Sequence, residues 1–155
     1  MSNRTVMPSD AEHLTALAAT NLGNQANPNP TGWIDTRGFS WVDFFCEFDS
    51  ASNATSIVAT FEQASTLAEP SAAYPATVSN VRSFAHESWD SGSSTFQQQA
   101  YVAVSPTLSA GDYADEGWVF TVPAHGRWVR MVVYGTNISS PSSSDVITVR
   151  AYRRS

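Results

Sequence analysis

Few residues of this chain have the types and spacing that catalysis or metal binding requires. The three histidines, His13, His86 and His125, lie far apart, and none has the spacing of two histidines on one helical turn. The sequence contains no Gly-x-Ser-x-Gly elbow, and Cys46 has no histidine at a spacing typical of a nucleophilic pair. We therefore predict no catalytic residue, no metal site and no cofactor.

Two short polar stretches are the best remaining candidates for a cation site. His86, Glu87 and Asp90 fall within one polar stretch and could bind an ion, although a solvated turn explains them equally well. The acidic residues within 112–116 lack the alternating carboxylates of a calcium loop. Neither stretch changes the prediction that the chain holds no metal.

Aromatic side chains offer a different chemistry, the stacking of rings on a sugar or on a protein partner. The chain has five tryptophans, and two of them, Trp33 and Trp89, fall outside the best strand patterns. A row of exposed rings would suit glycan binding. Sandwich cores and oligomer interfaces also use tryptophan and tyrosine, and this second use is favoured.

These residues must be positioned by strands, because period-two alternation is the clearest pattern in the chain. Two runs carry it best, residues 126–134 and 145–153. In each run the apolar residues fall on one face, namely Val129, Met131 and Val133 in the first and Ile147, Val149 and Ala151 in the second. We predict that the runs pair as an antiparallel hairpin through the polar linker 135–144, which is too long for a tight turn.

Further strands are predicted upstream, with apolar faces that can cover this hairpin. They span residues 40–48, 55–63, 77–84, 96–104 and 116–122, and the first two are expected to pair as a hairpin. Residues 64–75 are expected to be irregular and residues 85–94 to form a polar loop. The predicted fold is all-β: a single antiparallel β-sandwich of about seven strands, jelly-roll-like, with a closed barrel as the alternative.

The first 31 residues are predicted to lie outside the sandwich, which would occupy residues 32–155. Residues 9–19 fit a short helix behind a capping box and fit an extended segment packed on a sheet equally well. Residues 21–31 include Pro28 and Pro30 in an Asn-Pro repeat and are expected to form a loop or an arm without regular structure.

Composition narrows the function classes. The chain has 155 residues, a net charge of −6 and eight basic residues, all of them arginine. It lacks the basic track of a nucleic-acid binder, has no targeting signal, and has no apolar run long enough to span a membrane. Hydrophobic residues make up 42% of the chain, enough for a core, in which Cys46 is predicted to be a small buried hydrophobe. Arg150, Arg153 and Arg154 suggest edge protection or salt bridges to a partner.

Two blocks together carry a resemblance to a known group of proteins. Residues 32–39, Gly-Trp-Ile-Asp-Thr-Arg-Gly-Phe, lead into a strand, and residues 126–130, Gly-Arg-Trp-Val-Arg, precede a closing strand at 146–150. This pattern resembles the small β-sandwich structural proteins of tailed bacteriophages, among which capsid decoration (cement) proteins are closest in size. The resemblance covers roughly Trp33 to Arg153 and brings no catalytic residues with it.

The resemblance implies a non-enzymatic virion component that is made in the host cytoplasm and assembled onto the outer capsid surface. Its expected partner is the major capsid protein, its expected state is a homotrimer, and its expected action is to bridge and stabilise capsid subunits. Residues 21–31 and the amino terminus are the expected contact with the capsid. The alternative is a tail or fibre-associated module that holds host-surface glycan, and a β-sandwich enzyme or free lectin has the least support. The candidate interface residues are Trp33, Trp89, Pro28, Pro30, Arg153 and Arg154.

Overall fold

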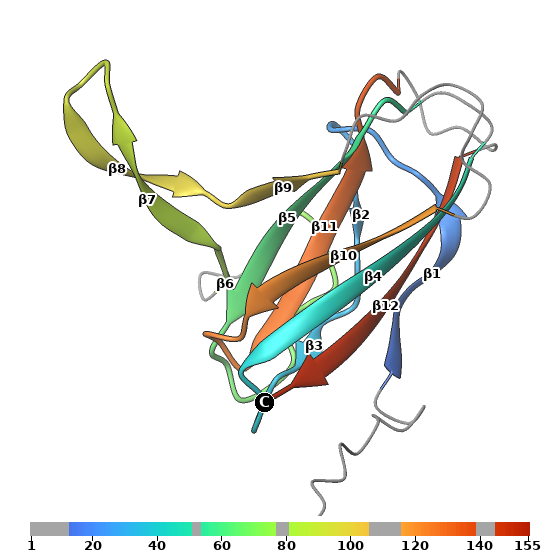
Figure 1. The fold of residues 1–155 in the computed structure, drawn as a ribbon. Helices are drawn as coiled ribbons and strands as arrows, with labels where there is room; N and C mark the ends of the chain where they lie inside the picture. Colours follow the sequence, from blue (N-terminus) through green and yellow to red (C-terminus); the bar gives the residue numbers. More distant parts are fainter. Residues whose placement is uncertain (1–12, 51–53, 77–80, 106–115, 139–144) are drawn as a thin grey trace, which may run out of the picture.

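The computed structural model describes residues 13–50, 54–76, 81–105, 116–138 and 145–155, and these form two antiparallel β-sheets packed face to face (Figure 1). The first sheet has the order β1 (His13–Asn21), β12 (Asp145–Arg154), β4 (Trp41–Ser50), β10 (Glu116–Pro123). The second has the order β2 (Asn29–Pro30), β11 (Trp128–Gly135), β5 (Ile57–Ala64), β6 (Val81–Ser83), with β3 (Ile34–Asp35) beside β11 and β9 (Val102–Val104) beside β5. β7 (Ala85–Asp90) and β8 (Thr95–Ala100) pair with each other.

The predicted all-β antiparallel sandwich is confirmed, with more strands than expected. Twelve strands lie within the described ranges, against a prediction of about seven. The difference comes from short strands at the sheet edges, namely β2, β3, β6 and β9, and from the hairpin β7–β8. Short edge strands carry too few residues for their alternation to stand out in the sequence.

The core lies between the two sheets and is formed by the faces that alternation predicts. Val42, Phe44, Cys46 and Phe48 of β4 are all buried, and Phe44 meets Phe61 of β5 across the core with ring centroids 5.9 Å apart. The predicted apolar faces of β11 and β12 are buried as well. Burial raises the pKa of the Cys46 thiol to about 12, which agrees with its prediction as a buried hydrophobe.

Both predicted hairpins are wrong, because their strands lie in opposite sheets. β11 pairs with β5, whereas β12 pairs with β4 and β1. β4 likewise pairs with β10 and β12 and not with β5. Alternation fixes which face of a strand is buried, but it does not say whether a second strand covers that face from the opposite sheet or lies beside it in the same sheet.

The amino-terminal region belongs to the sandwich earlier than the predicted boundary at residue 32. β1 pairs with β12, so residues 13–21 are extended and the helix alternative is wrong there, while residues 1–12 lie outside the described ranges. β2 pairs with Val132 and Val133 of β11, so the prediction of no regular structure in 21–31 is wrong at Asn29 and Pro30. Pro30 is tolerated because β2 is an edge strand, where a missing N–H breaks no second ladder.

Candidate interaction site

A buried arginine on the outer side of the second sheet explains the position of Trp33. Arg130 of β11 is fully buried, and its Nε donates to Oε2 of Glu62 at 2.6 Å. The guanidinium lies over the Trp33 ring at 4.5 Å and over the Tyr74 ring at 5.7 Å. Its Nη1 and Nη2 donate to the carbonyl oxygens of residues 72 and 73, each at 3.1 Å. We call Arg130, Glu62, Trp33 and Tyr74 the arginine cluster.

The arginine cluster removes Trp33 from the candidate interface. Only 7% of Trp33 is exposed, and its indole N–H donates to the carbonyl of Ser71 at 3.0 Å. The Trp33 side chain therefore holds the segment 65–76 against the second sheet and does not face solvent. A buried charged group is tolerated only when it is paired and hydrogen-bonded, which the ion pair with Glu62 and the two carbonyl hydrogen bonds of Arg130 achieve.

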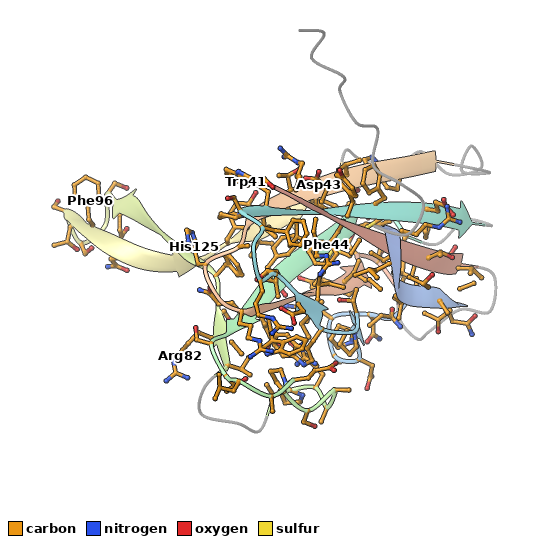
Figure 2. The ribbon with its side chains drawn as sticks, turned by 90° about the horizontal axis from the view of Figure 1, so that it is seen from below. Trp41, Asp43, Phe44, Arg82, Phe96 and His125 are labelled. Atoms are coloured by element: carbon orange, nitrogen blue, oxygen red, sulfur yellow. The ribbon has the colours of Figure 1, made fainter. Side chains whose placement is uncertain are left out.

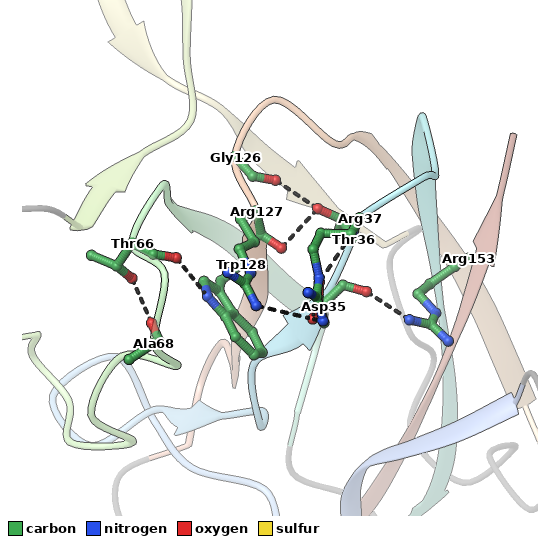
Figure 3. Close-up of polar contacts among 9 residues, drawn as sticks. All are labelled: Asp35, Thr36, Arg37, Thr66, Ala68, Gly126, Arg127, Trp128 and Arg153. Carbon is green, nitrogen blue, oxygen red and sulfur yellow. Dashed lines mark hydrogen bonds and ion pairs between the residues drawn. The ribbon is translucent and has the colours of Figure 1, made fainter.

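The two sequence blocks that carry the resemblance meet at one end of the sandwich (Figure 3). The Thr36 hydroxyl contacts the carbonyl oxygens of Gly126 and Arg127 at 2.6 and 2.9 Å, so the segment after β3 is held against the start of β11. Asp35 pairs with Arg37 at 2.7 Å. The Arg37 side chain holds the pKa of the Asp35 carboxyl below its ordinary value. These contacts are internal and serve the fold.

The other sequence-predicted interface residues are dispersed. Arg153 donates from Nη1 to the carbonyl of Asp35 at 2.8 Å and lies over the Phe39 ring at 4.6 Å. Pro28 and Pro30 are half-buried, and Pro30 pairs with Val132 of β11. The segment around them is held by Asn29, whose side-chain oxygen accepts the Gly23 N–H at 2.5 Å. The segment 21–31 is therefore attached to the second sheet and is not a free arm.

Arg154, another predicted interface residue, lies beside the exposed ring of Trp41. Its Nε and Nη2 donate to Asp43 at 2.6 and 3.2 Å, and its guanidinium lies 5.8 Å from the centroid of the Trp41 ring. Asp43 also accepts the hydroxyl of Thr121 at 2.7 Å. The contact with Asp43 raises the pKa of Arg154, while 44% of the Arg154 side chain stays exposed.

The most distinctive feature of the surface is a β-hairpin that extends away from both sheets (Figure 1). We call β7, β8 and the turn between them, residues 85–100, the arm. The register runs without interruption from Ala85↔Ala100 to Asp90↔Thr95. At its root the N–H of Tyr101 donates to the carbonyl of Phe84 at 2.8 Å. The predicted polar loop at 85–94 is therefore wrong, since residues 85–90 are a strand.

The end of the arm presents an aromatic ring. Phe96 is 65% exposed and lies at the far end of the arm from the sandwich (Figure 2). Trp89, the second tryptophan of the predicted interface, is the register partner of Phe96. The exposed Phe96 and the sequence-predicted Trp89 are therefore paired across the two strands of the arm. The prediction of a polar loop at 85–94 did not include this pairing.

The turn at the end of the arm is held by its own side chains. Asp90 accepts the Ser93 hydroxyl at 2.7 Å, the Gly92 N–H at 3.0 Å and the Gln97 side-chain amide at 3.0 Å. The Ser93 hydrogen bond, followed by that of the Gly92 N–H, lowers the pKa of the Asp90 carboxyl. The turn is thus pre-organised without support from the sandwich.

A pocket with a volume of about 350 Å³ opens where the arm leaves the sandwich. We call it the base pocket, and it is lined by Trp41, Gln63, Phe84, Tyr101, Thr121, Pro123 and His125. The Phe84 and His125 rings lie 6.0 Å apart, and Tyr101 rests on the core ring of Phe61 at 5.7 Å. Trp41 and Tyr101 are 40% and 39% exposed, so their rings are open to an incoming group.

The base pocket lies between two sheet edges that also expose apolar residues. β10 is the last strand of the first sheet, and its Val119 is 52% exposed. β9 lies along β5 of the second sheet, and its Val102 and Val104 are 46% and 57% exposed. Exposed apolar residues on edge strands invite contact with another chain. Val119 faces outward from the first sheet, whereas Val102 and Val104 face outward from the second sheet, because their neighbours Phe120 and Ala103 pack in the core.

The base pocket is lined mainly by aromatic and polar side chains. Within the described ranges, no group of three or more His, Cys, Asp or Glu residues is arranged to hold a metal ion. The base-pocket residues come from positions 41 to 125, so no local motif in the sequence marks them. The one signal that could have found the arm is the ring of Phe96 beside a run of three glutamines.

Comparisons with family models, curated proteins and solved structures found no match to this chain. Across the described part of the chain, no helix combines the length and apolar character that crossing a membrane requires.

Proposed function

We propose that this chain is a non-enzymatic structural protein of a bacteriophage virion, a capsid decoration (cement) protein on the outer surface of the shell. Its action is mechanical, because it bridges neighbouring subunits of the major capsid protein and stabilises the seams between them. It acts as a homotrimer. The observation that carries the proposal is the arm.

A two-stranded hairpin is marginally stable in water when nothing packs against it. The arm is nevertheless a regular ladder, and it extends from the sandwich with an exposed ring near its end. Such an element gains stability when a protein surface covers it. A projecting arm is also the shape that a bridging protein needs, because it reaches a neighbour without moving the folded domain.

The contacts of such a bridge can be individually weak. A trimer presents three copies of its capsid-facing surface, and once one copy is bound the others engage at a high effective concentration, so avidity exceeds the affinity of each contact. A large aromatic side chain at the centre of a contact is the residue type that most often dominates its binding energy. Phe96 is the ring that the arm offers for this role.

The direct test is the copy number of this chain in purified virions, measured by quantitative mass spectrometry against the major capsid protein. A decoration protein is expected at hundreds of copies, in a simple ratio to the capsid protein. A few to a few dozen copies would place the chain in the tail, neck or fibres, and absence from the particle would contradict the proposal.

A second experiment tests the arm itself. Capsids that lack the protein are mixed with wild-type protein or with Phe96→Ala, and the bound fraction is measured by co-sedimentation. We expect at least about 30-fold weaker binding for Phe96→Ala, since central aromatic residues often contribute 2 kcal/mol or more. Leu67→Ala is the matched control, because Leu67 is 87% exposed but lies in the segment 65–76, away from the arm. Equal binding of all three proteins contradicts a role for the arm.

The second candidate function is a tail or fibre-associated module that recognises host-surface glycan. The base pocket favours it, because aromatic rings such as Trp41 and Tyr101 stack on sugars while Gln63 and Thr121 can hydrogen-bond hydroxyl groups. The expected consequence is that Trp41→Ala reduces adsorption to host cells. Unchanged adsorption with this variant counts against the glycan function.

A further inference from the structure

We propose that the base pocket of one copy receives the arm of a second copy of this chain, with Phe96 as the anchoring side chain. The inference rests on the proposed function for its premise that the arm is a contact element, and it names the partner of that contact. It assigns the base pocket, which the sequence did not reveal, as the receptor. Copies joined in this way stand head to tail.

The arm cannot fill its own pocket. Tyr101 lines the pocket and is followed outward by the continuous ladder from Ala100 to Thr95. Phe96 is five residues from Tyr101, which on an extended strand is a distance on the order of 17 Å. Figure 2 shows Phe96 at the far end of the arm and His125 of the pocket near its root. Only another molecule can therefore bring a Phe96 side chain into the pocket.

The pocket and the end of the arm match in size and in polarity. At about 350 Å³ the base pocket lies near the lower limit of small-molecule pockets, which suits one aromatic side chain with its flanking backbone. Trp41, Tyr101 and His125 supply rings that can meet Phe96 edge-to-face or offset, the geometries that aromatic pairs favour. Burial of Phe96 removes from water a side chain that is 65% exposed.

The charges at the two surfaces are also complementary. The end of the arm carries the Asp90 carboxylate, whereas the pocket rim carries the Arg154 guanidinium next to Trp41. Both contacts of Arg154 with Asp43 use Nε and Nη2, and the side chain stays 44% exposed, so it can pair with a second carboxylate. Opposite charges on the two surfaces steer the encounter and fix its register.

The available surface is that of a small contact. A standard protein interface uses about 20–30 residues on each side. The arm offers two strands of 6 residues each with their turn and the pocket offers seven residues, which suits a contact that is repeated around an oligomer. A contact between different surfaces of identical chains closes into a ring when the rotation allows it, and a trimer is the smallest such ring.

Cysteine cross-linking between separately purified variants tests the proposal. Ser94→Cys, which keeps the Phe96 ring, is mixed with His125→Cys under oxidised glutathione, which accepts the two electrons released when two thiols form a disulfide. The native Cys46 is buried with a raised pKa and does not compete. We expect a covalent dimer that contains one copy of each variant. The matched control is Ser94→Cys with Leu67→Cys, whose cysteine is exposed in the segment 65–76.

The oligomeric state is measured in parallel by light scattering over a range of concentrations. Wild-type protein is expected to self-associate, and Phe96→Ala to do so at least about 30-fold more weakly. Added salt should weaken the association, because it screens the pair between Asp90 and Arg154. The inference is overturned if the yield of covalent dimer does not exceed that of the control and the wild-type protein is monomeric.

The outcomes also separate this inference from the proposed function. If the protein is monomeric and uncross-linked, yet its binding to capsids requires Phe96, the partner is wrong and the proposed function stands. If capsid binding is also unaffected by Phe96→Ala, both the inference and the proposed function are contradicted. Shifts of the Trp41 or Tyr101 resonances on addition of glucose or N-acetylglucosamine, identical in wild type and Phe96→Ala, would assign the pocket to a glycan and overturn the inference.

Discussion

Trp33 and Phe96 are both large rings outside the main core, and their surroundings differ in almost every respect. Trp33 is 7% exposed, lies against a guanidinium and donates its N–H to a backbone carbonyl. Phe96 is 65% exposed on a hairpin whose strands pair only with each other in the described part of the chain. The Arg130 guanidinium is fully buried among its partners in the chain, whereas most of the Phe96 side chain is exposed. The first arrangement stabilises a fold, and the second suits contact with another molecule.

The largest expected effect comes from breaking the arginine cluster. Arg130→Met leaves Glu62 half-buried without its partner and frees the carbonyls of residues 72 and 73. We expect a loss of about 3–5 kcal/mol in the free energy of unfolding, measured by urea denaturation. Arg150→Met is the matched control, because Arg150 pairs with Glu47 at 3.1 Å but both side chains are more than half exposed. That exposed pair should contribute about 1 kcal/mol or less. Similar losses of unfolding free energy for Arg130→Met and Arg150→Met would contradict the difference between the buried and the exposed ion pair.

The next prediction compares the loss of unfolding free energy when either of two phenylalanines that differ in burial is replaced by alanine. Phe61 is 1% exposed and meets the rings of Phe44, Phe84, Tyr101 and Phe120, so Phe61→Ala should cost about 3–5 kcal/mol of unfolding free energy. Phe96→Ala should change the unfolding free energy of the monomer by about 0.5 kcal/mol or less. Urea denaturation below the concentration of self-association measures both. A large loss with Phe96→Ala would mean that its ring supports the fold.

Removal of the arm should leave the sandwich intact. Replacing residues 87–98 by Asn-Gly joins the paired positions His86 and Gln99 through a two-residue turn that suits a hairpin. We expect the urea midpoint to stay close to that of wild type, while self-association and capsid binding are lost. An unfolded or strongly destabilised variant would show that the arm is part of the folding unit.

The smallest effect concerns the turn at the end of the arm. Because the Ser93 hydroxyl and the Gly92 N–H lower the pKa of Asp90 in the folded protein, the stabilisation of the turn is complete above the ordinary pKa of 3.8. It is lost as the pH falls through the lowered value. The Gly92 amide resonance, followed by NMR, should titrate with a midpoint below 3.8, and Asp90→Asn should abolish that titration. A midpoint at or above 3.8 contradicts the hydrogen bonds that hold the turn.

Sequence patterns predicted the faces of the strands better than their partners. The alternation in β4, β11 and β12 identified buried residues such as Phe44, Met131 and Val149 correctly, because burial on one face requires it. The same alternation suits strands that pair and strands that face each other across the core. The linker 135–144 is long enough for either arrangement, so the placement of β11 and β12 in opposite sheets could not be read from the sequence.

The candidate site was harder to predict than the fold. Residues 85–90, Ala-His-Glu-Ser-Trp-Asp, show no apolar alternation in the sequence, although they form a strand. The base pocket is assembled from five separate stretches of chain, and its rings are ordinary strand or loop residues in the sequence. Trp33 lies outside the predicted strands, which suggested an interface role. Its contact with the buried guanidinium of Arg130 explains its position instead.

Hydrogen exchange of the backbone amides, compared between wild type and Phe96→Ala by mass spectrometry, would test most directly whether the arm depends on a partner. At concentrations where wild-type protein self-associates, amides of residues 85–100 should be protected in wild type and should exchange rapidly in the variant. Amides of β4 and of β11 near Arg130 should be equally protected in both proteins, because their partners lie within the chain. Equal protection of the arm in the two proteins would show that the hairpin is stable on its own and would contradict its role as a contact between copies.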